Sequence, residues 1–216
     1  MKKKYNTLLG LILLIGLFIR TVGIADVNSG FYVDEASIGY NAKSILETGS
    51  DEYGQNFPLA FRSFGDYKSP LFVYANIPLV SVFGSAVGAR LTSAILGVIT
   101  IWLVAEITRK LSGGKAGLLA GIILATLPWH ANLSRHGVEP VLSSVLLSGA
   151  ILCFMNKRRM LGFLGLALST LAYHSTKYIS PILALLILII MKEKKINKNK
   201  IGKILVGLVW VAVMII

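Results

Sequence analysis

Eight apolar runs follow one another along the chain, and this pattern restricts its fold more than any other feature of the sequence. One helical crossing of a bilayer core of about 30 Å needs roughly 17 to 25 mostly apolar residues, and several runs approach that length. The chain is 55% hydrophobic and 15% charged, whereas about 25% of the residues of a soluble domain are charged. We therefore predict an all-α polytopic membrane protein, and not a soluble enzyme or a disordered chain. The runs cover residues 7–24, 70–89, 91–108, 116–130, 138–155, 160–176, 178–191 and 204–216.

The net charge of +12 raises the question of a nucleic-acid-binding protein, which would gather its basic residues on one soluble face. In this chain the basic residues form four clusters that apolar runs separate, so nucleic acid is not an expected partner. The single cysteine, Cys153, lies inside an apolar run and excludes both a disulfide framework and a thiolate metal cage.

The basic clusters predict the orientation of the chain, because short loops rich in Lys and Arg stay on the cytoplasmic side. If residues 70–89 lie at the outer surface and do not cross, 15 of the 22 basic residues fall on the inside together with the N-terminus. We therefore expect about seven transmembrane helices, a cytoplasmic N-terminus and a location in the plasma membrane. Residues 7–24 could instead be a cleaved signal peptide, with Gly23 and Ala25 as small residues at the cleavage site.

This topology leaves a long first outer loop, about residues 25–89, which holds seven of the ten acidic residues. Loops of this length are usually functional or disordered. Residues 36–48 carry apolar side chains at helical spacing and stop before Gly49, so we expect an amphipathic juxtamembrane helix on the outer leaflet. Residues 70–83 form a second such element, broken by Pro78 and Gly84.

Charged residues near the outer ends of the spans are candidates for a functional site. Asp34 and Glu35 form an acidic pair after the first span, and single cations return from later outer segments. A carboxylate can deprotonate an acceptor hydroxyl, and Lys or Arg can neutralise a phosphate leaving group. Simpler explanations stay open: Asp34 can cap a helix that begins at Glu35, and the cations can snorkel to the interface or bind lipid head groups. These cations are Lys68, Arg135 and Lys177.

A metal site is a second possibility on the same side. His136 and Glu139 lie in one short outer loop, and with Asp34 they offer the imidazole and carboxylate ligands that suit several divalent ions. No spacing is diagnostic, so a divalent metal ion is a possible cofactor and no metal is assigned. Asp66 joins His136 and Glu139 as a candidate for contact with an acceptor or a metal.

Three segments stand in an order that is fairly specific as a series, although each motif alone is short. They are FYVDEASIGYNAKSILETG, then GDYKSPLFVYANIPLVSVFG, then the long stretch that begins ARLTSAILG and ends SRHGVEP. From about residue 5 to residue 190 the chain resembles the N-terminal transmembrane part of GT-C-fold, polyprenyl-phosphate-dependent glycosyltransferases. This superfamily includes the protein O-mannosyltransferases and the lipid A aminoarabinose transferases.

The resemblance implies roles for residues of the first outer loop. The essential carboxylate of such enzymes falls on Asp34, with Glu35 beside it. The Lys-Pro-Pro-Leu-like motif appears as Lys-Ser-Pro-Leu, which places Lys68 at the donor phosphate and replaces one proline by Ser69. The Ala-Arg-Leu motif that opens the next span contains Arg90. The GT-C-like bundle also implies juxtamembrane helices in this loop.

The later outer loops carry the other motifs of the resemblance. The pattern of an Arg followed by an acidic residue and Pro is matched by Arg135, Glu139 and Pro140. The Thr-Lys motif contains Lys177, but Tyr178 stands where these enzymes usually have Gly, which puts the role of Lys177 in doubt. Arg135 would join Lys68 at the donor phosphate.

The function implied is transfer of a sugar from a polyprenyl-phosphate-linked donor to an acceptor protein, lipid or glycan on the outer face. Asp34 would act as base, with inversion at the anomeric carbon, and Tyr32, Tyr67 and Trp129 could form apolar walls for the sugar or prenyl chain or simply an interfacial belt. Related enzymes are generally longer, so we expect residues 1–216 to form a single transmembrane domain of a larger transferase. A non-catalytic fragment, and a transporter or lipid-binding membrane protein, remain alternatives.

Overall fold

The computed structural model describes residues 2–26 and 32–192, and these residues are mostly helical. Eight helices and one short β-hairpin lie within the described part. The helices are α1 (Lys2–Thr21), α2 (Val33–Thr48), α3 (Pro70–Ser112), α4 (Gly114–Thr126), α5 (Pro128–Leu133), α6 (Pro140–Met155), α7 (Arg159–Ser169) and α8 (Thr176–Lys192). The antiparallel hairpin joins β1 (Phe61–Ser63) to β2 (Asp66–Lys68).

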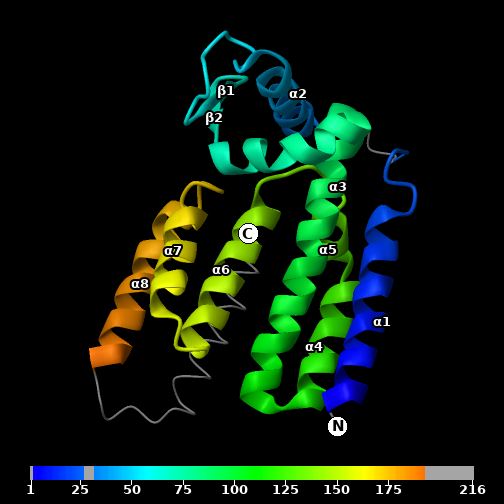
Figure 1. Cartoon of the computed structure of the whole chain (residues 1–216), viewed down its shortest axis with the longest axis vertical. Coiled ribbons are helices and arrows are strands. Elements are labelled where there is room, and N and C mark those ends of the chain that lie inside the picture. Colours follow the sequence, from blue (N-terminus) through cyan, green and yellow to red (C-terminus); the bar gives the residue numbers. More distant parts are fainter. Residues whose placement is uncertain (1, 27–31, 193–216) are drawn as a thin grey trace.

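The long helices run side by side. The segment that contains α2, the hairpin and the first part of α3, which we predicted as the first outer loop, lies across one end of them (Figure 1). α1 packs against α3 and α4, α3 also packs against α6, and α6 packs against α7. We call the end that carries α2 and the hairpin the α2 end. The N-terminus and the α3–α4 turn lie at the opposite end (Figure 1).

A sharp kink divides α3 into two segments at Gly84, whose φ of 78° and ψ of 168° are not helical. Glycine adopts this positive φ without the steric penalty that a Cβ would bring. Residues 70–83 therefore lie across the α2 end, whereas residues 85–112 descend along the bundle (Figure 1). The expected break at Gly84 is confirmed, but Pro78 lies inside the first segment and does not end it.

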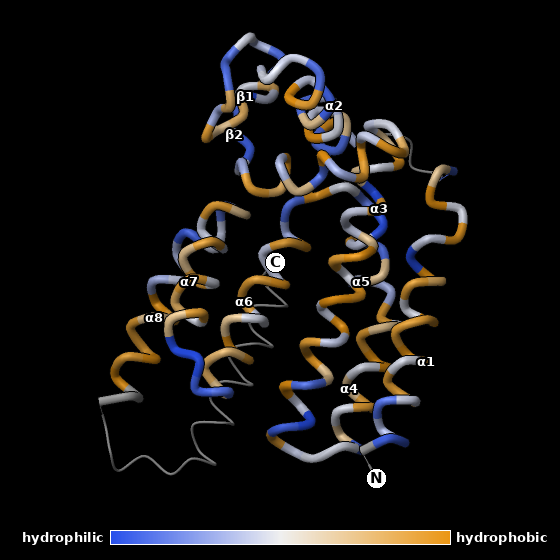
Figure 2. Tube along the Cα trace, viewed as in Figure 1, coloured by the Kyte–Doolittle hydropathy of each residue, from blue (hydrophilic) through white to orange (hydrophobic). Residues whose placement is uncertain are grey.

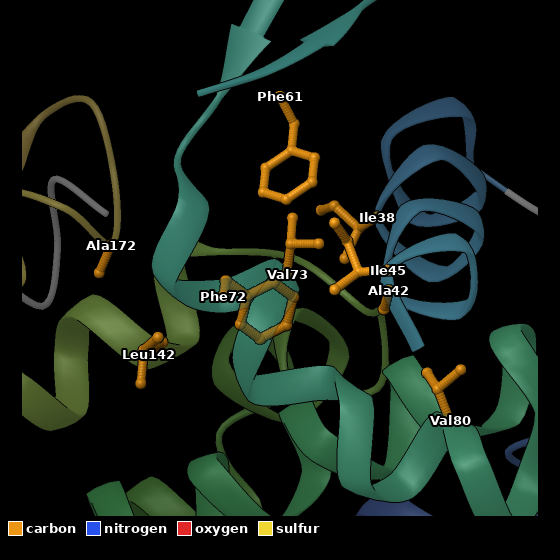
Figure 3. Close-up of a cluster of buried hydrophobic side chains, with 9 residues drawn as sticks. All are labelled: Ile38, Ala42, Ile45, Phe61, Phe72, Val73, Val80, Leu142 and Ala172. Atoms are coloured by element: carbon orange, nitrogen blue, oxygen red, sulfur yellow. The ribbon is translucent and has the colours of Figure 1, made fainter. Parts of the chain in front are cut away.

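The amphipathic helix that we expected over residues 36–48 is α2, which begins three residues earlier. It ends at Gly49, whose φ of 73° is left-handed and whose N–H donates to the carbonyl of Ile45. Much of the apolar face of α2 is covered by α3 and the hairpin, although Leu46 is 46% exposed (Figure 3). This buried cluster includes Ile38, Ala42, Ile45, Phe61, Phe72, Val73 and Val80.

Two helical stretches within the described part are long and apolar enough to cross a membrane by length and composition, Lys3–Thr21 and Pro70–Ser112. Four further apolar stretches are shorter, so seven crossings are not confirmed. The run at 204–216, which we predicted as the last span, lies outside the described residues. Apolar residues line the long helices, and hydrophilic residues gather toward both ends (Figure 2). The shorter stretches are Gly114–Thr126, Pro140–Met155, Arg159–Ser169 and Thr176–Ile189.

Replacing Gly39 with Ala should reduce the unfolding free energy by about 1 to 3 kcal/mol. A Cβ at this position would lie 2.5 Å from the carbonyl oxygen of Ser85, where α2 crosses α3. The clash is with backbone, so no change of side-chain rotamer can relieve it. Thermal unfolding of the detergent-solubilised protein measures the effect. Gly149→Ala in α6 is the matched control, because nothing lies within 4 Å of its Cβ position. Equal melting temperatures for the two variants would contradict the close contact.

Candidate functional site

Asp34 and Lys68 form an ion pair at the α2 end, with 2.9 Å between Nζ and Oδ1. Asp34 lies in the first turn of α2, and Lys68 ends β2. The Lys68 side chain is 12% exposed and the Asp34 side chain 33%, so the carboxylate is the more open partner. The capping explanation for Asp34 is wrong, because α2 begins at Val33 and its N-cap residue, Tyr32, makes no side-chain capping bond.

Three carboxylates surround the ammonium group of Lys68, and together these four residues are called the Lys68 cluster. Asp66 lies 3.5 Å from Nζ, and Glu139 adds its charge from the start of α6. Burial alone would lower the pKa of Lys68, but the hydrogen bond to Asp34 and the negative charges of all three carboxylates raise it above its usual value. Lys68 is therefore a permanent cation held among carboxylates.

Glu139 is the most buried carboxyl group of this cluster and was not predicted to contact Lys68. The N–H of Ser69 donates to its carboxylate, and within the described part its Oε1 is buried without a hydrogen-bond partner. Burial raises the pKa of Glu139, and the nearby charge of Lys68 opposes that rise. Buried acids with raised pKa values gather at functional sites, which makes Glu139 a candidate site residue.

Glu35 has quite different surroundings from its neighbour Asp34. It is fully buried and accepts from Arg90 at 2.7 Å to Oε1 and 3.0 Å to Oε2. The N–H of Gly137 donates to Oε1 at 2.8 Å, and Arg90 also donates to the carbonyl of Ile24 at 3.0 Å. Burial would raise the pKa of Glu35, but these hydrogen bonds outweigh it and lower the pKa. Glu35 is therefore an ionised carboxylate that joins elements, closed to substrate.

Arg90 could have been recognised from the sequence as more than a motif residue. A guanidinium between two apolar runs needs a partner, and the outer loop is rich in carboxylates, although the sequence does not show which of them pairs with Arg90. Arg20 belongs to the same class: it is fully buried and donates to the carbonyls of Leu124 and Ala125 and to Nδ1 of His130. Both arginines hold the ends of helices together.

The other two predicted phosphate ligands lie apart from this cluster. Arg135 donates to the carbonyls of Ile19 at 2.6 Å and Val22 at 2.8 Å, and so satisfies the last carbonyls of α1. Lys177 is exposed in the first turn of α8. Nearer to the cluster, Nε2 of His174 hydrogen-bonds to the carbonyl of Tyr67, which ties the segment before α8 to the hairpin.

The described residues contain no group of three His, Cys, Asp or Glu side chains that could hold a metal ion. His136 lies 3.9 Å from Oε2 of Glu35, whereas Glu139 and Asp34 both face the ammonium group of Lys68. Within the described residues, His136 is therefore not grouped with Glu139 and Asp34 as a metal-ligand set.

A cleft of about 350 Å³ lies beside the loop that carries Gly137, since His136 and Val138 both line it. Tyr32, directly before α2, and Trp129, in α5, supply aromatic walls, as the sequence had suggested. Tyr67 does not line this cleft. The complete lining is Tyr32, Trp129, Asn132, Leu133, His136 and Val138.

Residues 68–216, more than half of the chain, match the family described as dolichyl-phosphate-mannose-protein mannosyltransferase. With the apolar helical bundle, this match defines a membrane glycosyltransferase of mannosyltransferase-like character. The chain belongs to that family, which has the GT-C fold, and the resemblance inferred from the motifs is confirmed. No curated protein and no solved structure matches the chain. The matched segment begins at Lys68 and includes Arg90 and Glu139, whereas Asp34 and Glu35 precede it.

Replacing Arg90 with Met should lower the unfolding free energy by about 3 to 5 kcal/mol, because it leaves the Glu35 carboxylate buried without its partner. Adding Glu35→Leu should recover part of the loss, which a double-mutant cycle of unfolding free energies measures. Arg109→Met is the matched control on the same helix. Arg109 pairs with Glu106, and both side chains are partly exposed. Breaking such a pair lowers the unfolding free energy by about 1 kcal/mol or less. Similar losses for the two single variants would contradict the distinction.

Proposed function

We propose that this protein transfers a sugar from a polyprenyl-phosphate-linked donor to a hydroxyl acceptor, with Asp34 as the general base. The observation that carries the proposal is the Asp34–Lys68 pair, in which a part-exposed carboxylate lies 2.9 Å from a mostly buried ammonium group. One group can accept a proton, and the other can stabilise a departing phosphate. The family description, which names a lipid-phosphate donor and a protein acceptor, supports the same chemistry.

In the proposed reaction the acceptor oxygen attacks the anomeric carbon as the bond from that carbon to the phosphate oxygen breaks. The acceptor proton passes to Asp34, and the electron pair of the broken bond leaves on the lipid phosphate. Single displacement of this kind inverts the anomeric carbon. Lys68 stabilises the charge that develops on the phosphate, and it can do so because its raised pKa keeps it protonated.

Asp34 is favoured over Glu35 as the base because of access. Glu35 is fully buried and already accepts three hydrogen bonds, two from Arg90 and one from Gly137. Asp34 is partly exposed, and its partner Lys68 can move toward a bound phosphate, which would free the carboxylate for the acceptor. Glu139 would keep the ammonium group near the site in this scheme, whereas Asp66 is mostly exposed and has no role in the transfer.

Among the three predicted phosphate ligands, the proposal relies on Lys68. Arg135 is engaged with the end of α1, and Lys177 is exposed in the first turn of α8. The aromatic cleft beside the loop that carries Gly137 is the proposed place for part of the donor, either its sugar or the first unit of its prenyl chain.

We further propose that the α2 end faces outward from a multi-pass protein of the plasma membrane. The support is the distribution of charge: the exposed basic clusters of α1, α3, α4 and the α6–α7 turn all lie at the opposite end (Figure 2). Short basic loops are retained on the cytoplasmic side, so this arrangement favours a cytoplasmic N-terminus. The residues concerned are Lys3, Lys4, Arg109, Lys110, Lys115, Lys157, Arg158 and Arg159.

Asp34→Asn should lower sugar transfer by about 100-fold or more, because the amide cannot take the acceptor proton. The assay is release of polyprenyl phosphate from dolichyl-phosphate-mannose by membranes that contain the protein. Asp66→Asn is the matched control, since it also removes a carboxylate beside Lys68 but one that is mostly exposed. Wild-type turnover by Asp34→Asn, with normal membrane insertion, would remove Asp34 from the mechanism.

Lys68→Gln should weaken donor binding and lower turnover, and Lys68→Arg should restore part of both, because a guanidinium also pairs with phosphate. Binding of the donor is measured directly, by equilibrium binding of radiolabelled dolichyl-phosphate-mannose to the purified protein. Lys177→Gln removes an exposed cation from the chain and serves as the control. If it weakened donor binding as much as Lys68→Gln does, the phosphate contact could not be assigned to Lys68.

A further inference from the structure

A second and larger cavity lies at the opposite end of the bundle, far from the Lys68 cluster. It is a groove of about 780 Å³ between α1, α3 and the start of α4. Its walls are mainly apolar and include Leu9 and Leu13 of α1 and Trp102 of α3. Trp102 is 40% exposed, which leaves a large apolar ring open along the groove.

The mouth of this groove is cationic. Arg109 makes a bidentate ion pair with Glu106, with a shortest distance of 2.6 Å, and its guanidinium lies 5.4 Å from the centre of the Tyr5 ring. Glu106 is the only acidic residue in the sequences of α1, α4 and the long segment of α3. The ion pair balances Arg109 alone, so the nearby exposed lysines leave an excess of positive charge. These are Lys3, Lys4, Lys110 and Lys115.

The start of α4 adds backbone donors to the same place. Gly113 and Gly114 line the groove, and α4 has no side-chain capping bond. The first N–H to find a helical acceptor belongs to Gly117, which donates to the carbonyl of Gly113. The preceding N–H groups of the first turn are thus available to an anion, which the helix dipole also favours.

We propose that this groove binds an anionic phospholipid. One acyl chain lies along Leu9, Leu13 and Trp102, and the phosphate lies at the mouth, between the exposed lysines and the first turn of α4. The apolar wall and the cationic mouth together select this ligand: inorganic phosphate would leave the apolar wall open, and an apolar helix would leave the lysines without a counter-charge. The proposal rests on the membrane setting proposed above and not on the transfer reaction.

The test uses the fluorescence of Trp102 in the full-length protein in nanodiscs. Trp129→Phe and Trp210→Phe leave Trp102 as the only tryptophan of the chain. A small fraction of chain-brominated phosphatidylglycerol or brominated phosphatidylcholine is added to a phosphatidylcholine host, and quenching is followed against its mole fraction. We expect half-maximal quenching at a mole fraction about fivefold lower for the anionic lipid. Equal curves for the two lipids would overturn the proposal.

Three variants separate a groove site from general attraction to a basic surface. Gly10→Phe should abolish the preference, because Gly10 lines the groove and its Cβ position meets nothing within 4 Å, so the ring can fill the groove without a clash at its base. Lys110→Gln with Lys115→Gln should also reduce the preference. Lys157→Gln with Arg158→Gln removes the same charge from the α6–α7 turn and should leave it unchanged. A preference that survives Gly10→Phe, or that falls equally in the last variant, would refute a site in the groove. Donor binding at Lys68 is measured separately, so failure of either proposal is distinguishable from failure of the other.

Discussion

The buried ion pair between Glu35 and Arg90 is the interaction on which the α2 end depends. Arg90 lies in the second turn of the long segment of α3, and it binds both Glu35 in α2 and the carbonyl of Ile24 after α1. Gly137 donates to Glu35 from the loop before α6. Removing two charges from water is costly, and the cost is recovered only where hydrogen bonds are plentiful and well aligned. Four segments of the chain must therefore meet correctly for this pair to form, and the same segments bring Asp34 and Glu139 near Lys68.

The kink at Gly84 divides α3 into two segments that pack against different parts of the protein. Its first segment forms the floor on which the apolar face of α2 packs, and its second segment is a long helix of the bundle (Figures 1 and 3). Lys68 and Ser69 stand directly before this floor, so the hairpin delivers the ammonium group to the first turn of α2. The close approach of Gly39 to Ser85, directly after the kink, sets how α2 lies across it. The position of Asp34 relative to Lys68 is thus determined by packing, not by the loop alone.

The sequence was sufficient to predict several helices, but not the β-hairpin or the contacts between the elements. Helical spacing and glycine stops predicted α2 and the break at Gly84, because both depend on local backbone preferences. The charge pattern indicated Asp34 and Lys68 as site residues but did not show that they touch. Glu139 and Arg135 were grouped with them, and the structure separates the two: Glu139 is buried beside Lys68, whereas Arg135 holds the end of α1. The difference arises from the partner that each side chain meets across the fold. Local patterns in a single sequence do not identify these long-range partners.

The Asp-Glu pair also shows how adjacent residues of like charge can have unlike tasks. Successive side chains of an α-helix point about 100° apart, so Asp34 and Glu35 cannot share one environment once α2 packs against α3. Glu35 turns into the bundle, where Arg90 and Gly137 fix it as an ion and close it off. Asp34 turns toward the hairpin, where Lys68 is its counter-ion and the Asp34 side chain stays 33% exposed. The three donors that anchor Glu35 also hold its neighbour Asp34 at a set position, and they leave the Asp34 carboxylate able to accept a proton. Such preorganisation is what the proposed general base requires.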